Sequence, residues 1–274
     1  MYKIQSSISA QEFKKVAELI YRHAGIVLSD QKNEMVYNRL SRRLRELKIS
    51  TFNEYIARLE SNHKDPEWQC FVNALTTNLT SFFREGYHFP VLAEHARRRR
   101  GNYSVWCTAS STGEEPCSIA MTLNDVLDNS YSGPRVWATD IDTDVLTKAK
   151  NGIYQLEDLQ NISEGHKKKY FLKGTGAQSN LVKVRKELLD TIHYQQLNLM
   201  DQHWDIPEQF DAIFCRNILI YFEQKTQERL LLRFSKMLKK GGLLFLGHSE
   251  SIVNGKVPFR LRGQSVYYLL EDQK

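Results

Sequence analysis

The sequence predicts an α/β protein in which a small all-α domain precedes a doubly wound, mostly parallel sheet. Two patterns predict this order. Residues 1–75 read as a succession of amphipathic helices with clear capping signals, and from about Tyr103 short β-rich runs alternate with helical stretches. The length of 274 residues suits two modest domains. We therefore expect a helical domain over residues 1–75 and a sheet domain over residues 76–274.

Composition narrows the class of protein. Hydrophobic residues make up 41% of the chain, which suits a packed core, and no apolar run approaches the ~18 residues of a membrane span. The start of the chain shows no apolar signal region, and the four cysteines and eight histidines show no disulfide framework or metal-ligand spacing. We expect a cytoplasmic protein without a metal site. The formal net charge of +6 favours an acidic partner, either nucleic acid or an acidic protein surface.

Capping signals mark the helices of the first domain. Ser9 with Glu12 and Thr51 with Glu54 each have the spacing of a capping box, so we expect the first and third helices to begin there. The pair Asp65–Pro66 has the residue types that begin a fourth helix.

The second helix is expected over about residues 30–48. Its apolar stripe should pack within the helical domain, which leaves its basic side chains pointing outward. These are Arg39, Arg42, Arg43, Arg45 and Lys48. They form either an ordinary solvated face or a surface that complements an acidic substrate.

Five β-rich runs are expected to form the sheet: Val105–Ala109, Val136–Thr139, Ala212–Cys215, Leu243–Leu246 and Val266–Leu269. A long helix should run from about Gln224 to Lys240 and end at Gly241–Gly242. No helix separates the last two β-rich runs, so they should pair antiparallel at one edge of the sheet.

The segment 170–198 interrupts the alternation. It contains a turn around Gly174 and Gly176, an alternating run that includes Lys183, and a further β-rich run from Ile192. We interpret the segment as a small antiparallel β insertion.

Polar residues follow the expected strands at the edge of the sheet where ligands bind in open α/β folds. Asp140 follows the second run, and an acidic residue there can accept hydrogen bonds from a ribose diol. The turn after the first run has a single glycine, Gly113, which argues against a dinucleotide. Glu114 and Glu115 would repel a phosphate and suit a cationic cofactor such as S-adenosylmethionine. The alternative is that these glutamates only stabilise the start of a helix.

Six segments, in the same order over nearly the whole chain, carry a resemblance to a known family. They are Asn78–Arg84, Ser111–Pro116, Thr139–Asp142, Lys173–Gly176, Phe214–Phe222 and Gly247–Glu250. These segments resemble those of the bacterial chemotaxis receptor glutamate methyltransferases, the CheR family. The resemblance implies a Rossmann-like methyltransferase sheet and methyl esterification of glutamate side chains on chemoreceptors. It also implies S-adenosylmethionine as the cofactor and S-adenosylhomocysteine as the product.

The resemblance also assigns residues. The positions that match the cofactor contacts of the family are Asn78, Thr80, Arg84, Glu115, Asp140, Asn198, Leu199, Arg216 and Asn217. The insertion would offer a sheet edge to the C-terminal peptide of a receptor, with Gly174, Gly176 and Lys183 as contributing residues. Lys183 stands where relatives with such insertions often carry arginine.

The chemistry agrees with these residues. A glutamate carboxylate is already ionised at pH 7, so its attack on a sulfonium methyl needs alignment rather than a general base. Arg84 can hold a carboxylate bidentately, either that of the substrate or that of the cofactor, and Tyr221 can donate one hydrogen bond. Arg84 and Tyr221 are therefore the candidate catalytic residues, although Tyr221 lies in an apolar run and could belong to the core.

Two other functions compete with this one. A nucleic-acid methyltransferase could use the basic helix on phosphates, but the loop after Cys215 lacks the Pro-Pro-aromatic turn of amino-methylating enzymes. A non-catalytic adaptor could bind the cofactor as a sensor, but the chain retains every matched site position. We therefore expect chemoreceptors as partners, with no nucleic acid and no membrane insertion.

Overall fold

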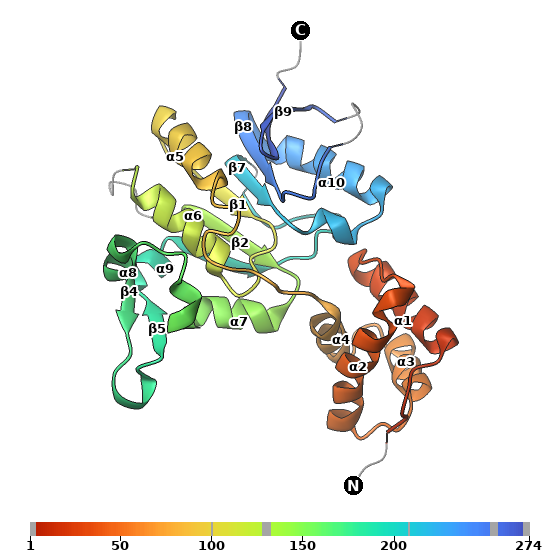
Figure 1. Cartoon of the computed structure of the whole chain (residues 1–274). Helices are drawn as coiled ribbons and strands as arrows, with labels where there is room; N and C mark the ends of the chain where they lie inside the picture. Colours follow the sequence, from red (N-terminus) through yellow and green to blue (C-terminus); the bar gives the residue numbers. More distant parts are fainter. Residues whose placement is uncertain (1–3, 100, 128–132, 208, 253–256, 271–274) are drawn as a thin grey trace.

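The computed structural model describes residues 4–99, 101–127, 133–207, 209–252 and 257–270. The N-terminal unit consists of four helices: α1 (Ala10–Ala24), α2 (Asn33–Leu47), α3 (Phe52–Ser61) and α4 (Glu67–Leu75), with a 3-10 turn η1 (Asp30–Lys32) before α2. Figure 1 shows these helices as a cluster beside the sheet domain. Their apolar faces form a core of their own around residues such as Val16, Leu40, Tyr55 and Phe71.

The predicted capping boxes at the starts of α1 and α3 are confirmed, and α4 begins at Glu67, one residue later than predicted. At α1 the Ser9 hydroxyl accepts a hydrogen bond from the Glu12 amide, and the Glu12 carboxylate accepts one from the Ser9 amide at 2.8 Å. The same reciprocal pair forms at α3 between Thr51 and Glu54. At α4 the carboxylate of Asp65 accepts a hydrogen bond from the Glu67 amide at 2.9 Å. Local sequence is enough to fix these ends because each cap satisfies backbone donors that a helix leaves unpaired.

The expectation that all the basic side chains of α2 point outward is wrong for two of them. Arg39 donates hydrogen bonds to the carbonyl oxygens of Ala74 and Thr76, and Arg43 holds the carboxylate of Glu67 at 2.9 and 2.7 Å. Both arginines flank the apolar stripe of α2, and their long side chains reach α4 and the residue after it. The exposed basic residues of α2 and its end are Arg42, Arg45 and Lys48.

The main sheet has seven strands in the order β6-β2-β1-β7-β8-β10-β9. The strands are β1 (Val105–Cys107), β2 (Val136–Asp140), β6 (Ile192–Gln196), β7 (Phe210–Cys215), β8 (Leu238–Leu246), β9 (Phe259–Gly263) and β10 (Val266–Leu269). The first five in spatial order pair parallel, and β10 pairs antiparallel with both β8 and β9. This arrangement confirms the mostly parallel sheet with an antiparallel edge hairpin. Strand β9 was not predicted from the sequence.

Helices cover both faces of the sheet, as a doubly wound fold requires. They are α5 (His88–Arg98), α6 (Glu114–Asn124), α7 (Thr143–Asn151) and α10 (Gln224–Met237). Along β1, Cys107 packs with residues of α5 and α6, whereas its neighbour Trp106 packs with residues of α10 on the other face. None of the described helices is long and apolar enough to cross a membrane.

Helix α10 is shorter than expected. It ends at Met237, and β8 begins at the next residue, so the pair Gly241–Gly242 lies within the strand rather than at a helix end. The start of β8 pairs with the start of β7 through Phe210 and Leu238. The strand pairing, which is a long-range contact, thus replaces the last turn that the local sequence favours.

The small antiparallel insertion exists, but its expected bounds are wrong at both ends. Its three strands, in the order β3-β5-β4, are β3 (Ile153–Gln155), β5 (Leu181–Val184) and β4 (Phe171–Lys173). The run from Ile192 forms β6 instead, which pairs parallel with β2 along five residues and is an edge of the main sheet. The remaining short elements are η2 (Leu156–Leu159), α8 (Glu164–Tyr170), η3 (Gly176–Gln178), α9 (Lys186–Leu189) and η4 (Leu219–Tyr221).

Candidate active site

A cleft opens at the carboxyl ends of β1, β2 and β7, where the helical unit meets the sheet domain. Its polar lining includes Asn78, Thr80, Arg84, Glu115, Asp140, Arg216 and Asn217. Its apolar lining includes residues that the helical unit contributes, namely Ile26, Val27, Leu28 and Met35. Seven of the nine predicted cofactor residues and the candidate catalytic Tyr221 therefore line one cleft, whose walls come from both units.

Asp140 is a fixed acceptor at the end of β2. It is 7% exposed, and its two carboxylate oxygens accept hydrogen bonds from the backbone amides of Ser111 (2.8 Å) and Asp142 (3.0 Å). Burial raises the pKa of Asp140 to about 6, and the neighbouring charge of Asp142 adds to the rise. The group is therefore mainly ionised at pH 7 and held in one orientation.

Residues 78–84, which precede α5, are hydrogen-bonded to loops at the same edge of the sheet. The side-chain amide of Asn78 donates to the Asp142 carboxylate at 2.8 Å, and the carbonyl of Asn78 accepts from the Ser111 hydroxyl at 2.9 Å. Arg84 donates to the carbonyl of Leu79 at 2.8 Å, which closes the segment on itself. These bonds fix the polar wall that carries Asn78, Thr80 and Arg84.

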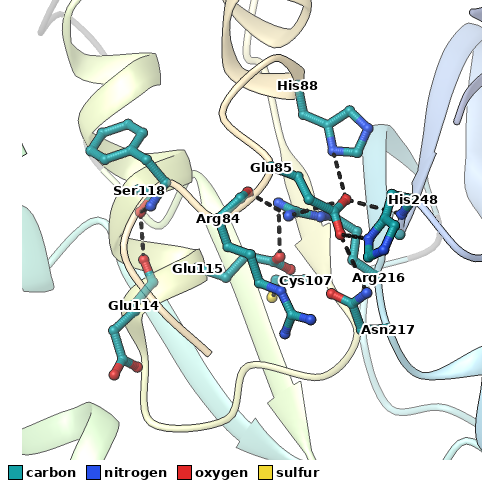
Figure 2. A network of polar contacts seen from close by, with 12 residues as sticks. Arg84, Glu85, His88, Cys107, Glu114, Glu115, Ser118, Arg216, Asn217 and His248 are labelled. Atoms are coloured by element: carbon teal, nitrogen blue, oxygen red, sulfur yellow. Dashed lines mark hydrogen bonds and ion pairs between the residues drawn. The ribbon is translucent and has the colours of Figure 1, made fainter. Parts of the chain in front are cut away.

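Arg216 and Glu115, which also line the cleft, form a buried ion pair. The Arg216 side chain is only 1% exposed, and its Nη1 lies 3.1 Å from Oε2 of Glu115 (Figure 2). Burial raises the pKa of Glu115, while the charge of Arg216 opposes the rise. Glu114, in contrast, accepts a hydrogen bond from the Thr112 hydroxyl at 2.6 Å and does not line the cleft. The helix-start interpretation thus fits Glu114, and only Glu115 faces the cleft.

The two arginines of the cleft differ in what they can still bind. Arg216 is held by carboxylates, since it also lies 3.5 Å from Oε2 of Glu85. The guanidinium of Arg84 makes one hydrogen bond and no ion pair within the described part of the chain. Arg84 is therefore the cleft arginine whose guanidinium no carboxylate holds, and it can take up an incoming carboxylate.

Tyr221 is half-buried in η4 and lines the cleft, so it does not belong to the core. Its carbonyl accepts a hydrogen bond from the Val27 amide at 2.8 Å, which joins it to the helical unit. Its hydroxyl has no hydrogen-bond partner among the residues that the structure describes. It is therefore able to donate to a ligand.

Two of the predicted cofactor residues lie outside the lining of this cleft. Leu199 is 7% exposed and packs in the core on the α10 side of the sheet. The side-chain amide of Asn198 donates to the carbonyl of His23 at 2.7 Å and so ties the sheet domain to α1. Their assignment to the cofactor stays a prediction.

Glu250 supports the site from behind the loop after β7, a role that was not predicted from the sequence. It is 5% exposed, and its carboxylate accepts hydrogen bonds from the amides of Asn217 (2.8 Å), Gly247 (2.6 Å) and Leu219 (2.7 Å). It thereby holds the loop after β7, in which Asn217 has a left-handed φ of 56°. The only signal was its place in one of the six family-like segments, because nothing local predicts a contact between residues so far apart.

Comparisons with known proteins cover both units of the chain. The model of the all-alpha domain of the CheR methyltransferases matches residues 11–76, and the model of their SAM-binding domain matches residues 78–268. The chain is 56% identical over 266 residues to the chemotaxis protein methyltransferase of Klebsiella aerogenes, an alignment that covers 97% of this chain and 92% of that protein.

Two further relatives are similar over comparable lengths. The chemotaxis protein methyltransferase of Escherichia coli is 53% identical, with 97% of this chain and 93% of that protein covered. Chemotaxis protein methyltransferase 2 of Pseudomonas aeruginosa is 46% identical, with 94% of this chain and 92% of that protein covered. The similarity thus extends over nearly the full length of each relative.

Proposed function

The chain belongs to the CheR methyltransferase family, and from this premise we propose that it methylates glutamate side chains of chemotaxis receptors, forming γ-methyl esters. The methyl donor is S-adenosylmethionine, which the family's SAM-binding domain takes. The observation that carries the proposal is the single cleft in which Arg84, Glu115, Asp140 and Tyr221 meet. We further propose that the protein acts in the cytoplasm, on the cytoplasmic helices of these receptors.

The residues of the cleft fit S-adenosylmethionine. Asp140 offers an ionised, immobile carboxylate to the ribose hydroxyls, and the carboxylate of Glu115 suits a positively charged group. The same carboxylates would repel a phosphate. When bound, the cofactor supplies a methyl group activated by attachment to a sulfonium.

The protein's own residues need only orient the substrate. A glutamate carboxylate is ionised at pH 7, so no residue has to remove a proton. Arg84 can fix a carboxylate through two parallel hydrogen bonds, and the hydroxyl of Tyr221 can donate another. The apolar wall that includes Met35 and Ile218 limits water around the reacting groups. Alignment of this kind supplies several kcal/mol of the barrier reduction in general, up to ~7–11 kcal/mol at its limit.

The three-stranded sheet is the proposed docking place for a receptor tail. Lys183 lies exposed on the central strand β5, flanked in register by Ile153 of β3 and Leu172 of β4, which are 50% and 47% exposed. A Cβ at Gly174 would lie 2.1 Å from the carbonyl oxygen of Gln178, so the turn between β4 and β5 requires glycine there, and Gly176 has a φ of +57°. An extended peptide could add to an edge strand, which would raise the local concentration of the substrate.

A labelling experiment tests the function. The protein is incubated with S-adenosylmethionine carrying a radiolabelled methyl group and with receptor-bearing membranes, and the labelled receptor is then treated with base. Methyl esters release methanol in base, so the label should become volatile. Label that stays on the receptor in base, or no receptor label at all, would contradict the proposal. Membranes without receptors provide the control.

Tyr221→Phe should lower kcat while leaving the affinity for S-adenosylmethionine nearly unchanged. The change removes one hydroxyl that has no partner in the described structure, so the fold should tolerate it. The loss of one hydrogen bond in the transition state corresponds to ~0.5–1.5 kcal/mol, or about a 2- to 12-fold lower kcat. Steady-state kinetics and calorimetry on the same preparation check this. Wild-type turnover would remove Tyr221 from the proposed machinery.

Arg42→Glu combined with Arg45→Glu should slow methylation of the receptor at low ionic strength more than at high ionic strength. Both side chains are exposed on α2, so they can act on an acidic receptor helix only through screened contacts of ~0.2–1 kcal/mol each. The measurement is kcat/KM for the receptor across a salt series, with the affinity for S-adenosylmethionine expected to stay constant. Lys236→Glu with Arg260→Glu makes the same charge change on exposed residues of α10 and β9 and serves as the control. An equal slowing in both double variants would show that net charge, not α2, is responsible.

A further inference from the structure

The carboxylate of Glu85 contacts two other segments of the chain. Its side chain is 9% exposed and lies 3.5 Å from Nη2 of Arg216, 3.3 Å from Nδ2 of Asn217 and 2.9 Å from Nδ1 of His248. The backbone amide of His248 also donates to it, at 3.2 Å. Figure 2 shows these groups converging on Glu85 from the loop after β7 and from the turn after β8. Arg216 and Asn217 line the cleft, whereas Glu85 lies behind them.

The charge of Glu85 is stabilised where it lies. Burial by itself raises the pKa of Glu85, but the hydrogen bonds from His248 and the charge of Arg216 outweigh burial and hold that pKa below its usual range. The neighbouring His88 adds little charge of its own, because burial and the nearby Arg216 lower its pKa to about 4. Glu85 is therefore ionised at neutral pH, and Arg216 is its buried cationic partner.

The backbone around Glu85 is strained. Phe83 and Glu85 both have a φ of 52°, in the left-handed region that non-glycine residues rarely adopt. They stand on either side of Arg84, the candidate catalytic residue. The contacts of the Glu85 carboxylate help to hold this unfavourable conformation and so help to fix the direction in which Arg84 leaves the chain.

Glu85 is also one of two carboxylates that hold the guanidinium of Arg216. The Arg216 side chain lies between two carboxylates, those of Glu85 and Glu115, and the carbonyl of Arg84 accepts a further hydrogen bond from it. Without the charge of Glu85, the buried guanidinium would retain Glu115 as its only carboxylate among the described residues. It would then be drawn toward any further carboxylate in the cleft, in competition with Arg84.

We propose that Glu85 is a positioning residue for the methyl transfer. Its carboxylate positions Arg216 and Asn217, which line the cofactor cleft, and its backbone positions Arg84. The side chain of His248 holds the carboxylate of Glu85 in place. The effect of Glu85 on the rate of methyl transfer rests on the proposed function. The effect of Glu85 on the affinity for S-adenosylmethionine rests only on the family's cofactor, so this affinity can be measured without a receptor. A failure of the inference is therefore distinguishable from a failure of the proposed function.

The test compares Glu85→Gln with Glu67→Gln. Glu67 is a matched control because it is also a buried glutamate, 4% exposed, that pairs with an arginine, but its partners Arg43 and Tyr55 belong to the helical unit and it does not line the cleft. Glu85→Gln keeps the shape of the side chain and removes its charge, and it should weaken S-adenosylmethionine binding by at least about ten-fold in calorimetry. Glu67→Gln should lower the melting temperature and leave this affinity unchanged. Glu85→Asp, which keeps the charge, should restore part of the affinity.

Two outcomes would overturn the inference. Wild-type affinity in Glu85→Gln would show that the charge does not act on the cofactor. An equal loss of affinity in Glu85→Gln and Glu67→Gln would show a general structural effect. The part of His248 is tested with His248→Gln alone and combined with Glu85→Gln. If His248 acts through Glu85, the double variant should bind no more weakly than Glu85→Gln, whereas additive losses would refute that part.

Discussion

Replacing Arg84 with alanine should lower kcat/KM for the receptor by about 100-fold or more. Arg84 is the guanidinium of the cleft that no carboxylate holds in the described structure, so it is the residue that can fix an incoming carboxylate. Two charge-assisted hydrogen bonds at ~1.5–3 kcal/mol each account for a loss of this size. Steady-state kinetics with a purified receptor fragment provide the measurement.

Calorimetry on the same variant identifies which carboxylate Arg84 holds. If it holds the carboxylate of the cofactor, the affinity for S-adenosylmethionine should fall by the same factor as kcat/KM. If it holds the glutamate of the receptor, that affinity should stay constant and the loss should appear only with the receptor. Arg84→Lys is the matched variant, since it keeps the charge without the bidentate geometry, and it should recover only a small part of the activity. An alanine variant with the wild-type kcat/KM would show that Arg84 binds neither carboxylate during the reaction.

Asp140→Ala should weaken the binding of S-adenosylmethionine by about 100-fold or more, because two ribose hydroxyls lose a charged acceptor at ~1.5–3 kcal/mol each. The alanine also leaves the amides of Ser111 and Asp142 without their acceptor, which disturbs the wall of the cleft. Asp140→Asn keeps the size of the side chain and one acceptor oxygen, so it separates the loss of charge from the loss of shape. Calorimetry that shows unchanged affinity in both variants would refute the ribose assignment.

The pKa of Asp140 adds a pH dependence to this prediction. Its value of about 6 lies above the usual range for aspartate, so the free protein becomes protonated at Asp140 as the pH falls from 7 to 5. Only the ionised form can accept both ribose hydrogen bonds. The affinity for S-adenosylmethionine should therefore fall as the pH drops through 6, and Asp140→Asn should lack this dependence. An equal pH dependence in the wild type and in Asp140→Asn would assign the effect to another group.

Features that depend on a few neighbouring residues could be predicted from the sequence. The capping boxes at Ser9 and Thr51 involve residues three apart, and Asp140 could be placed because the carboxyl ends of parallel strands meet at one edge. The strand order itself follows only loosely from local patterns. The run from Ile192 looks like part of an antiparallel insertion, but it joins the main sheet because β2 offers it a full edge.

Features that depend on long side chains and distant partners could not be predicted. Arg39 and Arg43 look like surface residues from the period of α2, yet each is long enough to reach α4 or the residue after it. The contacts of Glu85 and Glu250 join residues more than a hundred and about thirty positions apart, respectively. No local rule ranks such buried carboxylates above the many exposed ones in the sequence.

Because both units line the cleft, a cofactor bound there would lie between the helical unit and the sheet domain. Val27 and Met35 of the helical unit line the same cleft as Asp140 and Arg216 of the sheet domain. The side-chain amide of Asn198 also donates a hydrogen bond to the carbonyl of His23. A molecule that contacts both walls would bind best when the two units are in place, so part of its binding free energy would stabilise their association. By the same linkage, any force that parts the units weakens the binding of the cofactor. A ligand that contacts both walls would therefore link the position of the helical unit to the occupancy of the cleft.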